Sequence, residues 1–279
     1  MNQISGSAWP DTLGGGPIEK PRAVLVLGDL IDDGDLKGQT ETQWNQWVAD
    51  FGLDGTDGLL RFPVFEGWGN HDGPPPGKEK NGFSVRAQVA KRTDLRLKSG
   101  RISHVSENGM HYSWDWGPVH FVQLNIYPAN RQHAGVRYDP VWHDPQMSLA
   151  FFVDDLKATV ADSGRPVVLL SHCGFDTDWW VKDDWLALHD AVKDYNIILY
   201  MYGHSGTGVG HWKPDGAEKP VTTINTGQTE KGFFVVQITA TRIRAAYRIK
   251  NLKSTPFAKD EWDGAWTWKY FLNEPIGKK

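Results

Sequence analysis

The chain has 279 residues, of which 39% are hydrophobic and 23% are charged, and its formal net charge at pH 7 is −4. A soluble globular chain of this length buries about 75% of its unfolded-state surface and needs no disulfide to fold. The mild negative charge argues against a general binder of nucleic acids or anionic membranes, because both require clustered basic residues. No apolar run approaches the roughly 20 residues that span a bilayer, and the single cysteine, Cys173, has no partner for an internal disulfide.

The first four residues, Met1–Ile4, carry neither a basic region nor an apolar run, so no signal peptide is visible. The chain contains 14 tryptophans and 10 histidines. Histidine titrates near neutral pH and is also a common metal ligand. The histidines are therefore the first candidates for a functional site.

The first half of the chain alternates short apolar runs with amphipathic segments. A short apolar run bounded by turn residues predicts a buried strand, and apolar side chains recurring at helical spacing predict a helix. After a loop rich in glycine and proline over residues 1–21, these patterns predict a strand at 22–27, a helix at 40–51, a strand at 62–65, a helix at 83–91 and a hairpin of strands at 111–116 and 119–124.

The second half continues this alternation and then becomes rich in strands. The predicted elements are a helix at 145–161, a strand at 166–170, a helix at 179–194, strands at 197–202, 221–225, 233–238 and 243–249, and a tail rich in tryptophan. No repeat or linker divides the chain, so we expect one domain over residues 1–279. Alternating strands and helices followed by strands indicate an α/β protein in which helices cover a mixed sheet system.

Four predicted strands are followed directly by a polar side chain of a metal-binding type. These side chains are Asp29, Asn70, His172 and His204. Ligands of open α/β sheets bind beyond the carboxyl ends of the strands, so we expect the four to converge. A carboxylate, an amide oxygen and two imidazoles suit Mn, Fe or Zn better than Ca²⁺ or a thiolate zinc site.

Each of these motifs alone has an ordinary structural explanation. Gly-Asp and Gly-Asn-His-Asp are common turns, and a single histidine is usually a core or surface residue. The order and shared context of all four motifs favour a metal site over coincidence.

The ordered set Gly28-Asp-x-x-Asp32, Gly69-Asn-His-Asp72, a strand-end histidine and Gly203-His204 resembles the calcineurin-like metallophosphoesterase superfamily over residues 24–204. The resemblance implies a four-layer α/β/β/α sandwich with a two-metal site at the strand ends. It also implies hydrolysis of a small-molecule phosphomonoester or phosphodiester by a metal-bound water, with Mn, Fe or Zn as the cofactor. The residues implied as metal ligands are Asp29, which would bridge both metals, and Asn70, His172 and His204, which would complete one of them.

The resemblance also implies two catalytic residues. The histidine of Gly-Asn-His-Asp, here His71, lies beside the metals in that superfamily and can protonate the leaving group. Asp72 is expected to orient His71 by a hydrogen bond, as a second group usually fixes the tautomer of a catalytic imidazole.

The chain departs from the superfamily pattern at two motifs. The opening Asp-x-His has no counterpart before Asp29, and the closing Gly-His-x-His ends in Gly206. Both losses fall on the same metal, so we expect one well-formed site beside a weak or vacant second site, and reduced activity. His211 is a candidate replacement ligand, although a loop histidine is the more ordinary interpretation. Asp33 replaces the phosphate-binding arginine of phosphoprotein phosphatases, which favours a small-molecule or diester substrate.

The missing Asp-x-His strand would lie inside a sheet, beside the strand that ends at Gly28-Asp29. The resemblance therefore implies either a truncated chain, or an adapted fold that lacks its first strand. Under the first alternative the start of the chain says nothing about the compartment, so the localisation is left unassigned. A lost interior strand exposes unpaired backbone groups on its neighbour. We expect another chain segment, such as one from a homo-oligomeric partner, to cover that edge.

The alternative function is that of a pseudo-phosphoesterase, which keeps the fold and one metal but acts as a binding or scaffold protein.

Other interpretations of single motifs are weaker. Residues 203–207 nearly match a nucleophile elbow, but they lack its last glycine and the following acid and histidine. Residues 206–210 are expected to be a flexible loop. Cys173 is expected to be a buried spectator, and Trp68 is a candidate for lining the substrate cleft.

Overall fold

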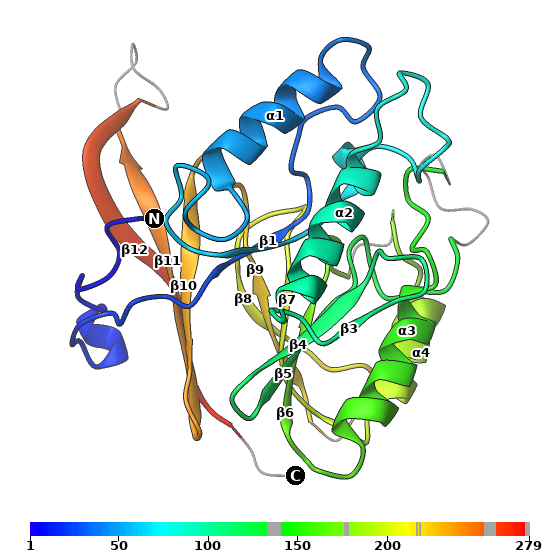
Figure 1. Cartoon of the computed structure of the whole chain (residues 1–279). Coiled ribbons are helices and arrows are strands. Elements are labelled where there is room, and N and C mark those ends of the chain that lie inside the picture. The colour runs from blue at the N-terminus through cyan, green and yellow to red at the C-terminus, as the bar shows by residue number, and fades with distance from the viewer. Residues whose placement is uncertain (133–140, 176–178, 216, 218, 254–260, 277–279) are drawn as a thin grey trace.

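The computed structural model describes residues 1–132, 141–175, 179–215, 217, 219–253 and 261–276 (Figure 1). The helices are the short 3-10 turn η1 (Asp11–Leu13), α1 (Thr40–Phe51), the 3-10 turn η2 (Asn70–Asp72), α2 (Val85–Lys98), α3 (Ser148–Asp155), the π-helical turn η3 (Leu156–Val160) and α4 (Lys182–Val192). Among the described residues, no helix has the length and apolar character needed to cross a membrane.

In the described part of the chain, the strands form three separate sheets. They are β1 (Val24–Leu27), β2 (Val64–Gly67), β3 (His104–Val105), β4 (Tyr112–Trp116), β5 (Val119–Gln123), β6 (Pro166–Leu170), β7 (Asn196–Tyr202), β8 (Gly208–Trp212), β9 (Val221–Asn225), β10 (Gly232–Ile238), β11 (Arg242–Leu252) and β12 (Trp262–Pro275). The seven-stranded sheet has the order β3-β4-β5-β6-β7-β9-β8, β1 pairs with β2, and β10-β11-β12 form the third sheet.

The seven-stranded sheet is mixed. Its interior strands β5, β6, β7 and β9 run parallel, whereas β3, β4 and β8 pair antiparallel with their neighbours. Figure 1 shows the three-stranded sheet on the left and α3 and α4 on the right, beyond the seven-stranded sheet. The predicted α/β class with a mixed sheet is confirmed, and the four-layer arrangement stays a prediction.

The interior parallel strands have the burial that their sequences predict. In β6, residues 167–170 are at most 2% exposed, because a parallel strand with neighbours on both edges and covered faces has no solvent side. The predicted strands, the hairpin and the helix at 40–51 are all present.

Helix α2 extends seven residues beyond the predicted end at 91, to Lys98. The sequence of this extension is polar and has the pattern of a solvent-exposed surface. Arg92 and Arg96 are nevertheless buried, because both form ion pairs with the fully buried Glu66. A buried carboxylate is stable only when such partners neutralise it. Periodicity of apolar residues therefore could not find the end of this helix.

One strand contradicts the sequence-based expectation, and another forms where no element was predicted. Residues 208–212, expected to be loop, form β8 and pair antiparallel with β9. The tryptophan-rich tail forms β12, which pairs with β11 over its length. Glycine interrupts the strand pattern in both segments, at Gly208 and Gly210 in β8 and at Gly264 in β12, so the local signal for a strand is weak.

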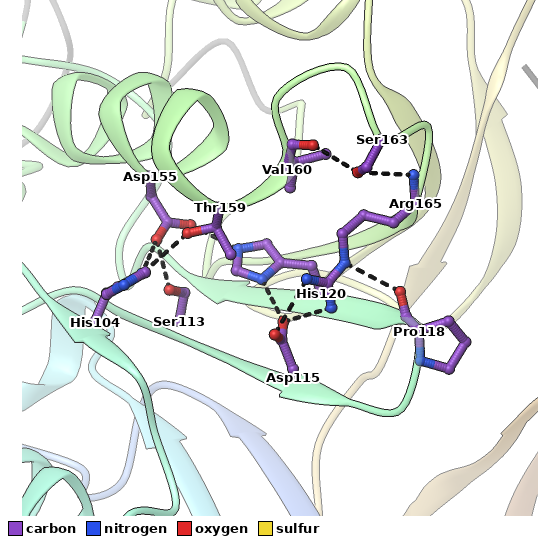
Figure 2. A network of polar contacts seen from close by, with 10 residues as sticks. All are labelled: His104, Ser113, Asp115, Pro118, His120, Asp155, Thr159, Val160, Ser163 and Arg165. Carbon is purple, nitrogen blue, oxygen red and sulfur yellow. Dashed lines mark hydrogen bonds and ion pairs between the residues drawn. The ribbon is translucent and has the colours of Figure 1, made fainter.

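A polar network joins α3 to the hairpin of β4 and β5 (Figure 2). His120 is fully buried, with Nε2 2.7 Å from Asp155 Oδ2 and Nδ1 2.8 Å from Asp115 Oδ1. The buried ring of His120 therefore bridges the carboxyl groups of Asp115 on β4 and Asp155 on α3. Burial alone would raise the pKa of Asp155, but hydrogen bonds from His120 and Ser113 outweigh it and lower that pKa.

Candidate metal centre

The structure brings the four strand-end side chains together. The Nε2 atom of His172 lies 2.9 Å from Asn70 Oδ1 and 3.1 Å from Asp29 Oδ2. The Nδ1 atom of His204 lies 3.2 Å from the same nitrogen. One nitrogen atom of His172 is thus the centre of the whole cluster.

The backbone fixes the tautomer of His172. Its Nδ1 atom lies 2.8 Å from the carbonyl oxygen of Leu27, the last residue of β1. A carbonyl oxygen only accepts, so Nδ1 carries a proton and donates it. Nε2 then faces a carboxylate and an amide oxygen that also only accept, and this arrangement requires a proton or a cation among them.

Charge coupling between Asp29 and His172 sets their protonation. Burial alone would lower the pKa of His172, but the charge and hydrogen bond of Asp29 outweigh it and raise that pKa. Burial alone would raise the pKa of Asp29, but the same ion pair and the hydrogen bond from the His71 backbone lower it to about 2. Asp29 is therefore ionised near neutral pH, and its charge favours a proton on His172.

Glycine allows the loops after β1 and β2 to pack backbone against backbone. A Cβ atom on Gly28 would lie 2.6 Å from the nitrogen of Gly69 and 2.8 Å from His172 Nδ1. A Cβ atom on Gly69 would collide with the carboxylate of Asp29. Any larger residue at either position would push the side chains of the cluster apart.

Asn125, which follows β5 after Leu124 and directly follows the strand predicted at 119–124, is a positioning residue that was not predicted from the sequence. Its Oδ1 accepts from the Trp68 backbone N–H at 3.0 Å, and its Nδ2 donates to Met110 O at 2.6 Å and to His111 Nδ1 at 2.9 Å. Its carbonyl accepts from the backbone N–H of His172 at 2.5 Å. Asn125 therefore couples the loop that carries Asn70 to the strand end that carries His172. The rule that found the four ligands, a polar residue directly after an apolar strand, also applies to it.

His71 and Asp72 do not contact each other in the expected way. The ring of His71 is exposed and its Nδ1 lies 2.5 Å from the Asp32 carbonyl oxygen, so that carbonyl, rather than Asp72, orients the ring. The buried Asp72 accepts from the Leu30 N–H at 2.9 Å and from the Gly69 N–H at 2.7 Å. Burial, followed by the charge of Asp29, raises the pKa of Asp72 to about 7. Asp72 thus ties the two ligand loops together.

Two other residues singled out in the sequence, His211 and Trp68, lie elsewhere, and a third, Cys173, lies beside the cluster. His211 is part of β8, and its Nε2 pairs with Glu274 Oε1 at 2.7 Å. Trp68 is fully buried under the guanidinium of Arg86, 3.7 Å from the ring centroid, so it does not line a cleft. Cys173 is fully buried in the core, and in the described chain it forms with His172 and His204 a group whose ligand atoms lie within 4.8 Å.

Trp179 is a second neighbour of the cluster that the sequence analysis missed. Its ring packs edge-on against His204, with the centroids 4.4 Å apart. The adjacent Trp180 is fully buried in the core. Two neighbouring tryptophans are ordinarily interpreted from the sequence as core packing. Trp179 restricts the ring of His204 from one side.

The chain belongs to the calcineurin-like phosphoesterase family, whose family model matches residues 8–207. No curated protein matches the chain. Among solved structures, GAP50, the anchor in the inner membrane complex of Plasmodium, is similar at 13% identity and a TM-score of 0.44, covering 91% of this chain and 78% of that one. The phosphopantetheinyl hydrolase PptH from Mycobacterium tuberculosis has 13% identity and a TM-score of 0.34, with coverage of 73% and 78%. TM-scores this low carry no inference for the chain.

Proposed function

We propose that the chain is a metal-dependent hydrolase of phosphate esters, acting on a monoester or diester of a small molecule. The ligands of its transition metal, Mn, Fe or Zn, are Asp29, Asn70, His172 and His204. The convergence of three polar atoms within 3.2 Å of His172 Nε2 is the observation that carries this proposal.

The donor set fits such a metal. Mixed carboxylate, amide and imidazole ligands suit Mn, Fe and Zn. Metal-ligating histidines almost always donate their other ring N–H to a carbonyl or carboxylate, as His172 does to Leu27. The proton that Asp29 stabilises on His172 would be released when a metal takes its place.

When bound, the metal supplies a Lewis acid that neutralises phosphoryl charge and activates water for attack. The exposed His71 donates its Nδ1–H to Asp32 O, so only Nε2 can face the leaving oxygen. With the ring doubly protonated, the Nε2–H bond would break to give its proton to that oxygen, and the ring would be left neutral with Nδ1–H still on Asp32 O. The Asp29 carboxylate accepts the His71 backbone N–H at 3.0 Å, so the ligand and the proton donor keep a fixed separation. Asp72 accepts the backbone N–H groups of Leu30 and Gly69, which flank Asp29 and Asn70 in the chain.

Metal content and turnover of purified variants test the proposal. His204→Ala should lower metal content, because it removes a ligand. His71→Ala should keep the metal and lower turnover of p-nitrophenyl phosphate or its diester by about 10²–10⁴-fold, the usual contribution of a general acid. His211→Ala, whose ring pairs with Glu274 outside the cluster, is the matched control and should change neither quantity. Unchanged metal content in His204→Ala would refute the ligand assignment.

The second candidate is a pseudo-phosphoesterase that binds rather than hydrolyses. Gly206 favours this function, because it stands where the superfamily pattern has its last histidine. The described residues also contain one group of His and Cys side chains that could hold a metal, whereas a dinuclear hydrolase needs ligands for two. If the metal-saturated protein hydrolyses neither ester faster than the double variant Asp29→Ala, His172→Ala, this second function replaces the first. Metal content distinguishes that outcome from a failed ligand assignment.

A further inference from the structure

The thiol of Cys173 lies next to the two imidazoles of the cluster. In the described chain, the Sγ atom of Cys173 and one ring nitrogen each of His172 and His204 all lie within 4.8 Å of one another. Cys173 is the only cysteine of the chain and is fully buried. An ordinary core cysteine packs as a small apolar side chain, whereas this one has two metal-binding side chains beside it.

The spacing of these atoms suits a single metal ion. Two nitrogens bound to a tetrahedral zinc at about 2.0–2.1 Å lie about 3.3 Å apart, and a sulfur bound at about 2.3 Å lies about 3.6 Å from each of them. The Nε2 atom of His172 and the Nδ1 atom of His204 are 3.2 Å apart, so the imidazole pair already has this spacing. The thiol, within 4.8 Å of a nitrogen of each ring, needs a shift of about 1 Å, which a change of its χ1 angle can supply.

Backbone hydrogen bonds hold Cys173 at this position. Its carbonyl oxygen accepts from Ser171 Oγ at 2.9 Å and from the Tyr200 hydroxyl at 3.0 Å. The carbonyl oxygen of His172 accepts from the Gly203 N–H at 2.8 Å, which ties the loop after β6 to the loop after β7. These bonds use backbone groups of the two ligand loops, so the thiol can rotate while both loops stay in place.

Charge balance favours a second anionic ligand. His172, Asn70 and Cys173 are at most 8% exposed. A divalent ion bound by two imidazoles, one amide oxygen and the Asp29 carboxylate leaves one positive charge in excess. A buried charge costs free energy unless a group of opposite sign neutralises it. A thiolate at Cys173 supplies the second negative charge, so that the ion and its ligands are neutral together.

We propose that Cys173 is a thiolate ligand of the metal held by His172 and His204, and that the centre therefore prefers Zn²⁺ to Mn²⁺. This role of Cys173 rests on the proposed metal centre, to which it adds one ligand. When the ion binds, the S–H bond breaks, the proton leaves to solvent and the electron pair of the thiolate forms the bond to the metal. No group is oxidised or reduced. Thiolate ligands favour zinc, whereas carboxylate and carbonyl oxygens favour Mn²⁺.

The absorption spectrum of bound cobalt reports on a thiolate ligand. Co²⁺ binds to the same nitrogen, oxygen and sulfur ligands as Zn²⁺, and the bound ion absorbs in the visible. A bond to thiolate adds an intense sulfur-to-cobalt charge-transfer band in the near ultraviolet. Because the chain has one cysteine, a band of this kind comes from Cys173. We expect both absorptions when Co²⁺ is titrated into the metal-free native chain in buffer without added thiols.

The variant Cys173→Ser keeps the shape of the side chain and removes the soft ligand. It should keep the visible absorption of bound Co²⁺ and lose the charge-transfer band. Its affinity for Zn²⁺ should fall by at least about tenfold, the smallest loss typical of residues that only support a ligand. Its affinity for Mn²⁺ is the matched control and should stay unchanged, because a change of packing alone would lower both affinities alike.

The outcomes separate the role of Cys173 from the metal centre itself. Visible absorption without the charge-transfer band in the native chain would overturn the role of Cys173 and leave the proposed centre intact. An absence of cobalt binding would overturn both. Equal losses of Zn²⁺ and Mn²⁺ affinity in Cys173→Ser would overturn the thiolate bond and assign the cysteine to packing. If the variant does not fold, the spectrum of the native chain decides alone, since Cys173 is its single thiol.

Discussion

Replacing Asn125 by glycine and by alanine separates the free-energy cost of losing its hydrogen bonds from the cost of backbone strain at its positive φ. Its side chain accepts the Trp68 N–H and donates to the Met110 carbonyl and to His111, and all of these groups are buried. The backbone of Asn125 also adopts φ = 60°, a left-handed conformation that asparagine and glycine tolerate and alanine does not. Asn125→Gly removes the hydrogen bonds without adding backbone strain, whereas Asn125→Ala removes them and adds that strain.

The magnitudes follow from the number of orphaned groups. Each buried donor or acceptor left without a partner costs about 1–3 kcal/mol. Losing the partners of the Trp68 N–H and the Met110 carbonyl, two buried groups, should therefore lower the free energy of unfolding of Asn125→Gly by about 2–6 kcal/mol. The left-handed backbone adds about 1–2 kcal/mol, so Asn125→Ala should be less stable than Asn125→Gly by that amount. Burial lowers the pKa of His111 to about 4, so its ring stays neutral near pH 7 and adds no charge to the cost.

Equilibrium urea unfolding of the two variants measures this difference. Asn45→Ala is the control, because Asn45 is exposed on α1 and its replacement should shift the free energy by less than about 0.5 kcal/mol. Metal affinity is the second readout, since losing a residue that positions ligand loops typically weakens it by about 10–100-fold. Equal stability of the glycine and alanine variants would refute the strain argument. Unchanged metal affinity in both would refute the coupling between the two ligand loops.

Two further predictions concern the packing of the ligand loops and the acid stability. Gly69→Ala should lower metal content while the chain stays folded by circular dichroism, because the added Cβ collides with the Asp29 carboxylate; full metal content would contradict this. Hydrogen bonds from His120 and Ser113 lower the pKa of Asp155 in the folded chain, so the ionised carboxylate stabilises the fold. This contribution to the free energy of unfolding is fully present above the unfolded pKa of about 3.9 and is lost as pH falls through the lower folded pKa. Melting temperatures measured between about pH 3 and pH 6 should fall less with acid for Asp155→Asn than for the native chain, and parallel profiles would argue against it.

The sequence predicts the position of the cluster better than its internal bonding. Asp29, Asn70, His172 and His204 follow apolar runs, and parallel strands place such ends at one edge. The partners that fix the cluster are the carbonyls of Leu27 and Asp32. Every residue has a carbonyl, so no residue type marks these two. The expectation that Asp72 orients His71 was wrong for this reason.

Buried charge limited the prediction of the fold. Helix α2 continues past its apolar pattern because Arg92 and Arg96 turn inward to Glu66. Before the fold is known, these three residues look like solvent-exposed groups 26 and 30 positions apart. Only the contact between β2 and α2 distinguishes the two interpretations, and that contact is long-range.

The backbone conformation of the strand-end residues explains why each motif alone is weak evidence for a metal site, whereas all of them together are informative. Asp29, Asn125 and His204 all have positive φ, at 53°, 60° and 63°. A chain that turns sharply out of a strand needs such a conformation, and Asp and Asn adopt it readily because their short side chains bond locally. For Asp29 and Asn125 the polar side chain is therefore explained by the turn itself. At His204 a positive φ costs about 1–3 kcal/mol, and the surrounding structure must hold it in place. Its contact with His172 in the cluster contributes to this.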